Sequence, residues 1–242
     1  MTGLLSLRPG WRRDLRSTLA GRLQAPFSSD VGHQTLLNTP KLLLITDLSG
    51  LRSEQLLQRC AAAMRGGVDA ILLRAPALDR AHLLALAAHL RDSTRQWGAR
   101  LLIHTHADIA RAVDADGVHV ARHAIAHIPA IRHWLGEDAS SMTLSASCHD
   151  DNELEAARRA GADFALLSPV FPTRSHPGAA TLGVTRFRQL AHKAGLPVIA
   201  LGGINPDNRD RLHGFGIAVI RAILHAPDPE LAARRLMPYD TD

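Results

Sequence analysis

The sequence predicts a (β/α)8 TIM barrel in a single domain, and three observations indicate this fold. Short apolar segments alternate with helical patterns from residue 41 onward, giving eight strand–helix units in about 200 residues. The strand segments are apolar at consecutive positions, as in parallel strands that are buried on both faces. No glycine-rich phosphate fingerprint follows the first strand, which disfavours an open doubly wound sheet. The predicted barrel spans residues 41–238.

The clearest strand–helix–strand unit lies in the middle of the chain. Residues 142–147 are small and apolar and predict a strand, and residues 164–167 predict a second, fully buried one. Between them, Asp150 is the expected N-cap of a helix that ends before Gly161, with Glu153 three residues later as in a capping box.

The other elements follow in order along the chain. Ser53 is the expected N-cap of the first helix, and Gly66 and Gly67 end it. The remaining strands are predicted at residues 42–45, 68–73, 100–103, 117–120, 197–201 and 217–220, and the remaining helices at about 53–65, 80–96, 108–113, 125–135, 185–194, 207–213 and from 229 onward.

Composition excludes several classes of protein. The chain has 242 residues, of which 46% are hydrophobic, and no run approaches the roughly 18 apolar residues of a membrane span. Two cysteines, Cys60 and Cys148, indicate no disulfide framework, so a reducing cytoplasmic location is expected.

The net charge of +5 is concentrated at the N-terminus. Residues 1–40 hold five arginines and two aspartates, giving +3, which leaves +2 for the remainder. This distribution argues against a nucleic-acid partner, which needs basic residues gathered on the folded surface. Residues 1–40 are predicted to be a flexible basic extension outside the barrel, with a transit peptide or the remnant of a linker as alternatives.

Two late loops predict a phosphate site. Gly202 and Gly203 follow the seventh strand, and Arg221 and Ala222 follow the eighth. Loops at these two places usually hold a phosphate in this fold, because glycine lets backbone N–H groups approach the oxygens closely. The alternative is that the two glycines only form a tight turn.

Polar residues at the carboxyl ends of the fifth and sixth strands predict further site residues. His149 and Ser168 are expected side by side on the rim where barrels carry their chemistry. The loop that begins at Ser168 is long enough to act as a binding loop, in which Thr173 and Ser175 offer hydroxyl groups and Arg174 and His176 offer charge. The alternative is a surface loop stiffened by its prolines.

Five motifs in order resemble one family. They are Ile45-Thr46-Asp47, Asp116-Gly117-Val118-His119, Ser147-Cys148-His149, Ser168-Pro169-Val170-Phe171-Pro172-Thr173 and Pro197-Val198-Ile199-Ala200-Leu201-Gly202-Gly203-Ile204. On these motifs, residues 43–233 resemble the thiamine-phosphate synthase and TenI superfamily of barrels. Residues 145–183 look most like TenI-type domains fused behind Nudix hydrolases, which implies a possible Nudix hydrolase partner.

The sequence departs from what the resemblance implies for a synthase. Where synthases hold a pyrimidine diphosphate with Gln-x-Arg-x-Lys, this chain has Leu72, Arg74 and Pro76. The two positions of the magnesium-binding aspartates are Thr105 and Ala124, and a loop lysine corresponds to His176. Without both carboxylates we expect weak Mg²⁺ binding, because Mg²⁺ is bound chiefly through carboxylate oxygens.

The thiazole-phosphate side of the family's site is kept, together with one histidine. The resemblance implies that His149 moves a proton on a thiazole phosphate, as in TenI-type tautomerases, which histidine can do without a metal. The expected function is therefore a metal-independent thiazole tautomerase with no cofactor. The expected ligand-binding residues are Arg74, Ser147, Ser168, Thr173, Ser175, His176, Gly202, Gly203 and Ala222.

Several alternatives stay open. The chain could be a thiamine-phosphate synthase that uses Mg²⁺, or a non-catalytic binder of a phosphorylated ligand that serves a Nudix enzyme. His149 could instead be a rim histidine that is only hydrogen-bonded in its loop. His104 and His106 could bind a metal, although a lone His-x-His pair is weak evidence. A homo-oligomer is also possible.

Overall fold

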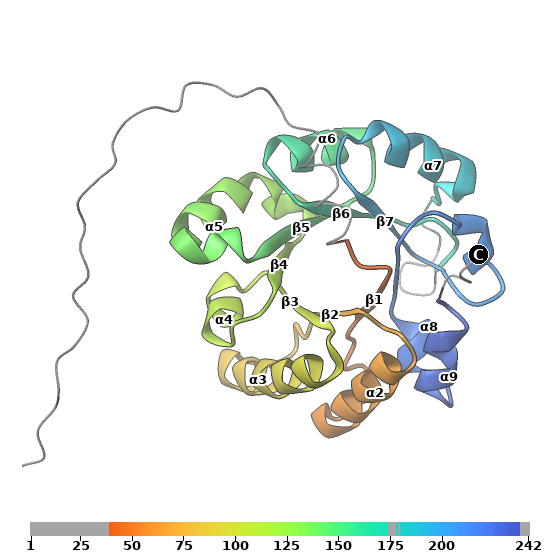
Figure 1. Ribbon diagram of the computed structural model, residues 1–242. Helices are drawn as coiled ribbons and strands as arrows, with labels where there is room; N and C mark the ends of the chain where they lie inside the picture. The colour runs from red at the N-terminus through yellow and green to blue at the C-terminus, as the bar shows by residue number, and fades with distance from the viewer. Residues whose placement is uncertain (1–38, 174–177, 179, 238–242) are drawn as a thin grey trace, which may run out of the picture.

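The chain folds into a closed barrel of eight parallel strands, as the sequence predicted (Figure 1). The structure is a computed structural model that describes residues 39–173, 178 and 180–237. The strands pair in the order in which they occur, and β8 pairs with β1 to close the barrel. They are β1 (Leu42–Ile45), β2 (Ala70–Leu73), β3 (Arg100–His104), β4 (Gly117–Val120), β5 (Thr143–Cys148), β6 (Phe164–Leu167), β7 (Val198–Leu201) and β8 (Ile217–Val219).

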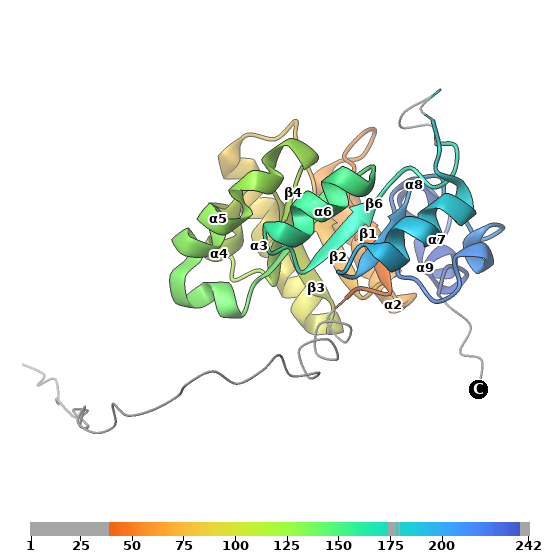
Figure 2. The same cartoon turned by 90° about the horizontal axis from the view of Figure 1, so that it is seen from above.

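Helices surround the barrel on the outside (Figures 1 and 2). The α-helices are α2 (Ser53–Arg65), α3 (Arg80–Trp97), α4 (Ala107–Ala112), α5 (Ile128–Leu135), α6 (Asp151–Arg159), α7 (Gly183–Lys193), α8 (Arg221–Leu224) and α9 (Pro229–Arg234). The described residues also form the 3-10 helices η1 (Arg122–His127), η2 (Gly136–Ser140) and η3 (Arg209–Leu212). Within the described ranges, no helix is both long and apolar enough to span a membrane.

The helix starts follow the local chemistry, with one correction. Asp150 caps α6 by accepting a hydrogen bond from the Glu153 backbone N at 2.9 Å, as predicted. Ser53 is not the N-cap of α2, because it is already the first helical residue. The N-cap is Arg52, whose backbone N donates to Gln55 Oε1 at 3.0 Å. Glutamine at this position satisfies a backbone donor that the helix leaves without a partner.

Two predicted helices are shorter than expected. The helix predicted at 125–135 is divided into η1 and α5, and Pro129 lies in the first turn of α5, where its missing N–H costs nothing. The helix predicted at 207–213 is the short η3. There Asn205 Oδ1 accepts from the backbone N of Asp207 and Asn208, so side-chain bonds satisfy backbone donors in the turn before η3.

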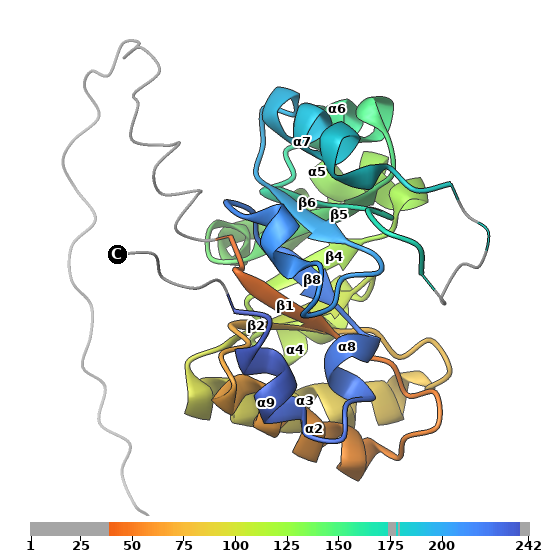
Figure 3. The same ribbon diagram turned by 90° about the vertical axis from the view of Figure 1, so that its right-hand side faces the viewer.

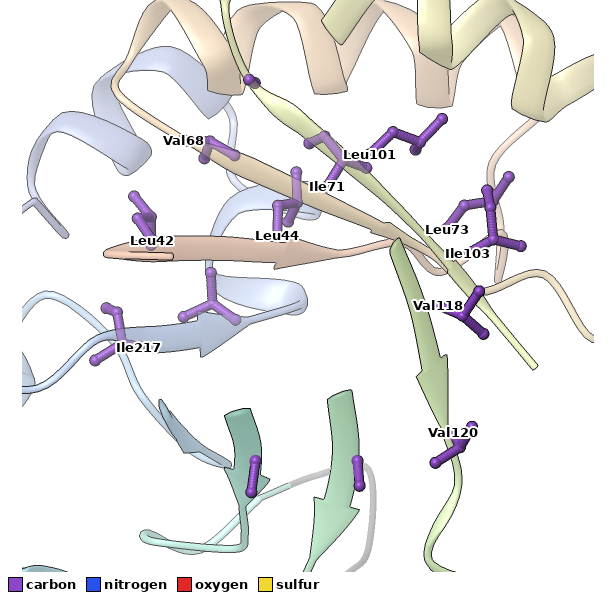
Figure 4. Packing of buried hydrophobic residues seen from close by; sticks show 14 of the residues in the cluster. Leu42, Leu44, Val68, Ile71, Leu73, Leu101, Ile103, Val118, Val120 and Ile217 are labelled. Carbon is purple, nitrogen blue, oxygen red and sulfur yellow. The ribbon is translucent and has the colours of Figure 1, made fainter. Parts of the chain in front are cut away.

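The core has two layers because each strand is buried on both faces. Leu42 and Leu44 point outward and pack with residues of the surrounding helices (Figure 4), whereas Leu43 and Ile45 point into the barrel. The inner layer consists of Leu43, Ile45, Ala70, Leu72, Leu102, Phe164, Leu166, Ile199 and Ala218. This arrangement explains why the strand segments are apolar at consecutive positions.

Most of the predicted N-terminal extension lies outside the described residues, so its flexibility stays a prediction. Pro40, which was placed in the extension, is buried. Its carbonyl oxygen would lie 2.3 Å from a Cβ built on Gly216, so glycine is needed there for the chain to pass. Pro40 therefore packs with the barrel, although the prediction assigned it to the extension.

Candidate active site

A cavity of about 570 Å³ opens at the carboxyl ends of β5 to β8. Figure 3 shows that the loops after β1, β2 and β6 extend together on this side of the barrel. The cavity is lined by His149, Ser168, Pro169, Pro172, Thr173, Leu201, Gly202, Gly203, Ile204, Asn205, Ala218, Val219, Ile220, Arg221, Ala222 and His225. A rim cavity between strand ends is the usual site of chemistry in this fold.

His149 is held in the cavity wall by a carboxylate one helical turn away. Its backbone N and its ring Nδ1 both lie 2.8 Å from Glu153 Oε2. The other oxygen, Oε1, accepts from Arg122 Nη1 at 3.2 Å. The predicted capping box therefore differs by one residue, because the Glu153 side chain accepts from the backbone N of His149 and not from that of the N-cap, Asp150. Among the described residues, Nδ1 is therefore the ring nitrogen that has a hydrogen-bond partner, and Nε2 is the one that has none.

The two glycines of the β7 loop lie where two loops touch. Gly202 and Gly203 have φ values of 102° and 68°. A Cβ at position 202 would lie 2.8 Å from Pro169 Cα, and one at position 203 would lie 2.4 Å from the Pro172 oxygen. Hydrogen bonds join the same loops, including Phe171 N to Gly202 O at 3.0 Å. The close packing of the two loops therefore explains why glycine stands at both positions, and a phosphate-binding role for the two glycines stays a prediction.

The structure brings together six of the predicted site residues, because the lining of the cavity includes His149, Ser168, Thr173, Gly202, Gly203 and Ala222. Arg74 and Ser147 are not among the lining residues. Ser175 and His176 lie outside the described residues, so their predicted roles stay untested. The lining residues Asn205 and His225 were not predicted, because no pattern in the sequence indicates them. The hydrogen bond between Glu153 and His149 was also not predicted, although their spacing of four residues could have indicated it.

Ser147 bonds a buried histidine inside the barrel. His119 is 2% exposed, and its ring nitrogens lie 2.9 Å from Ser145 Oγ and 2.8 Å from Ser147 Oγ. Burial, followed by the nearby His104, lowers the pKa of His119 to about 3. Burial is also the main cause that lowers the pKa of His104 to about 4. Both histidines are therefore neutral at pH 7.

The chain matches one family over most of its length. A family profile described as "Thiamine monophosphate synthase" covers residues 42–223. The chain belongs to this family. The resemblance inferred from the motifs is thus confirmed, and the Nudix hydrolase partner stays a prediction.

Curated relatives of the thiamine monophosphate synthase family cover the same barrel. The chain is 35% identical over 199 residues to a protein named thiamine-phosphate synthase from Roseiflexus castenholzii, covering 80% of this chain and 85% of that protein. It is 36% identical over 221 residues to the "Thiamine biosynthesis bifunctional protein ThiM/ThiE" of Symbiobacterium thermophilum. That match covers 90% of this chain but only 42% of the two-function protein.

Solved structures agree with the family assignment. "Thiamine phosphate pyrophosphorylase from Pyrococcus furiosus" superposes with a TM-score of 0.72 at 31% identity, over 81% of this chain and 93% of that one. A 3-hexulose-6-phosphate synthase gives a TM-score of 0.63 at 21% identity, over 81% of this chain and 98% of that one. The second match shows the barrel fold alone.

The residues on the β2–β4 side of the barrel mouth do not fit a magnesium site. Thr105 carries no charge, and its Oγ1 lies 2.8 Å from His104 Nδ1. Asp47 Oδ1 accepts from Ser49 N at 2.9 Å, and Asp108 forms an ion pair with Arg80. Among the described residues, no three or more His, Cys, Asp or Glu side chains are grouped so that they could hold a metal ion. Mg²⁺ is usually bound through one or two carboxylates together with substrate phosphates, and Thr105 supplies no carboxylate at the position where the family resemblance places one.

The predicted histidine pair has no further metal ligands grouped with it among the described residues. His104 ends β3 and His106 is the N-cap of α4, so the two side chains do not continue along one strand. They belong to no group of three or more metal-binding side chains in the part of the chain that the structure describes. The zinc alternative from the sequence therefore gains no support from these two residues.

Proposed function

We propose that the protein binds a thiazole phosphate in the cavity and acts in thiamine biosynthesis as a metal-independent tautomerase. The observation that carries this proposal is the bonding of His149. Its Nδ1 is occupied by Glu153, so Nε2 is the nitrogen available for proton transfer in a cavity that also contains the glycine loops. A positioned histidine of this kind typically contributes about 10²- to 10⁴-fold to a rate.

The proposed reaction moves one proton within the substrate. His149 Nε2 removes a proton from one position of the thiazole, and the resulting imidazolium returns it at another, so nothing is added or lost. Glu153 faces the imidazolium and offsets its charge. The phosphate is assigned to the side formed by Gly202, Gly203 and the turn at Ala222, where Arg221 adds a positive charge.

The names of the relatives favour a second function, thiamine-phosphate synthase. The family resemblance implies Mg²⁺ as the cofactor of this function. This reaction would join a pyrimidine diphosphate to the thiazole phosphate. Leu72 and Pro76 stand where the family resemblance places two groups that hold the pyrimidine, and Leu72 is 1% exposed within the barrel. These residues weigh against the synthase, so we rank it second. A non-catalytic phosphate binder that serves a Nudix enzyme is the third possibility.

One set of assays separates the three functions. Conversion between thiazole carboxylate phosphate isomers is followed by NMR with and without EDTA, and thiamine phosphate formation is measured from both half-substrates with Mg²⁺. We expect isomer conversion that EDTA does not change and no thiamine phosphate. Product formation that requires Mg²⁺ would establish the synthase instead. Binding without either reaction would leave the non-catalytic binder.

His149→Asn tests the assigned proton carrier. We expect conversion to slow by about 10²- to 10⁴-fold while affinity for the thiazole phosphate stays nearly unchanged. The matched control is His133→Asn, because His133 is exposed on the outer helix α5. Full activity of His149→Asn would exclude this residue as the proton carrier.

A further inference from the structure

We propose that Glu153 is a positioning residue for His149, which fixes the proton of the imidazole on Nδ1 and aims Nε2 at the substrate. This inference rests on the proposed tautomerase function for its kinetic consequence only. The position of the ring proton can be measured on the folded protein without substrate.

Glu153 holds His149 at two atoms. Oε2 accepts from the backbone N and lies at the same 2.8 Å from ring Nδ1, which fixes the ring relative to its own backbone. Oε1 lies 3.2 Å from Arg122 Nη1 in η1, so the carboxylate is held from a second element. The Glu153 backbone N bonds Asp150 Oδ1 at 2.9 Å, which anchors the start of α6. The Glu153 side chain is 20% exposed, against 43% for His149.

The carboxyl of Glu153 is ionised at neutral pH. Partial burial raises the pKa of Glu153, but the hydrogen bonds from His149 and Arg122 outweigh it and hold the pKa below the usual value. An ionised carboxylate has no proton to donate, so the proton between it and the ring belongs to Nδ1. The negative charge also stabilises the imidazolium that forms when Nε2 takes up a proton.

Other charged or titratable groups lie at the start of α6 or in the cavity lining. Asp150 lies at the same helix start, and Arg122 contacts the far oxygen of Glu153. Arg221 and His225 lie elsewhere in the lining of the cavity. Within the part of the chain that the structure describes, none of these groups forms a hydrogen bond with the ring, so Glu153 is the group whose removal should change the ring itself.

A purely structural role for Glu153 is the competing explanation, because its side chain also bonds the backbone before α6. Glu153→Gln separates the two roles. The glutamine oxygen can still accept from the His149 backbone N, whereas the charge is lost and the amide can donate to the ring as readily as accept. Glu155→Gln is the matched control. Glu155 lies two residues further along α6 and pairs with Arg158 and Arg159, not with His149.

The experiment records ¹⁵N NMR of the histidine ring in the full-length protein, comparing wild type, Glu153→Gln and Glu155→Gln. We expect the Nδ1–H tautomer in the wild type and in Glu155→Gln, and a mixture of tautomers in Glu153→Gln. Thermal denaturation checks that the variants are folded. An unchanged tautomer in folded Glu153→Gln would overturn the proposal.

The kinetic readout distinguishes positioning from stability. With the thiazole substrate, we expect Glu153→Gln to lower kcat by roughly 10- to 10³-fold with little change in KM, because binding does not use the ring proton. An equal loss in Glu155→Gln, or a change confined to KM, would contradict the positioning role. A wild type with no tautomerase activity would refute the proposed function, while the NMR result would still decide the tautomer.

Discussion

Replacing Gly203 by alanine should force apart two loops that form one side of the cavity. The backbone φ of 68° at this position costs alanine about 1 kcal/mol. The new Cβ would lie 2.4 Å from the Pro172 oxygen and 2.8 Å from the Phe171 carbonyl carbon, and such overpacking typically costs about 1 to 3 kcal/mol. We therefore expect the free energy of unfolding to fall by about 2 to 4 kcal/mol, which lowers Tm by about 4 to 16 °C in a domain of this size.

Gly98→Ala is the matched control for this variant. Gly98 has nearly the same φ, 66°, but nothing lies within 4 Å of its Cβ position, so only the cost of about 1 kcal/mol applies. Thermal denaturation compares the two variants, and calorimetry measures their affinity for the thiazole phosphate. We expect affinity to fall at least about tenfold in Gly203→Ala only. Equal melting temperatures would show that the loops relax freely, and the argument from the loop contact would then be wrong.

Three further predictions concern other parts of the chain. Burial lowers the pKa of His119 to about 3 in the folded protein, whereas the same side chain in the unfolded chain is protonated below about pH 6.5. Protonation of the unfolded state therefore lowers the stability as the pH falls from about 6.5 toward 3. The free energy of unfolding should therefore fall by about 2 kcal/mol more between pH 7 and pH 5 in the wild type than in His119→Gln. Urea unfolding at the two pH values measures this fall, and an equal fall in both proteins would refute the prediction. Removing residues 1–38 should lower Tm by less than the roughly 2 to 4 °C that corresponds to about 1 kcal/mol, and a larger loss in calorimetry would place them in the core. Arg74→Gln should leave isomer conversion within about twofold, because Arg74 is not in the cavity lining; a large loss would extend the site across the barrel mouth.

The strands could be predicted from the sequence because burial on both faces leaves a local signal. The predicted bounds of β1, β4 and β6 agree with the structure, since each is a short run of buried residues. The helix α8 was missed because four residues are too few to show a helical period. The helix predicted at 207–213 is only the short η3, because the side chains of Asn205 and Asn208 bond the backbone in the turn before it.

The site could be predicted only in part because its contacts depend on strand register. His119 lies opposite Ser145 through the pairing of β4 with β5, and no local pattern gives that register. No local pattern predicts the contact between Gly203 and Pro172 either, because it joins two loops about 30 residues apart in the sequence. The contact of the Ser147 hydroxyl with His119 could not be predicted for the same reason, and the ligand-binding role of Ser147 stays a prediction.

The two sides of the barrel mouth hold different groups, and this difference bears on the reaction. On the β2–β4 side, His104 and His119 are neutral because burial lowers the pKa of each, and Leu72 fills the barrel interior. On the β5–β8 side, the His149–Glu153 pair and Arg221 surround a cavity with the glycine loops. Joining two phosphorylated half-substrates needs the charge of a diphosphate leaving group to be neutralised beside the pyrimidine, whereas moving a proton on one thiazole needs the second side alone. The names of the relatives point to the joining reaction, and our proposal of proton transfer rests on the residues of this chain alone.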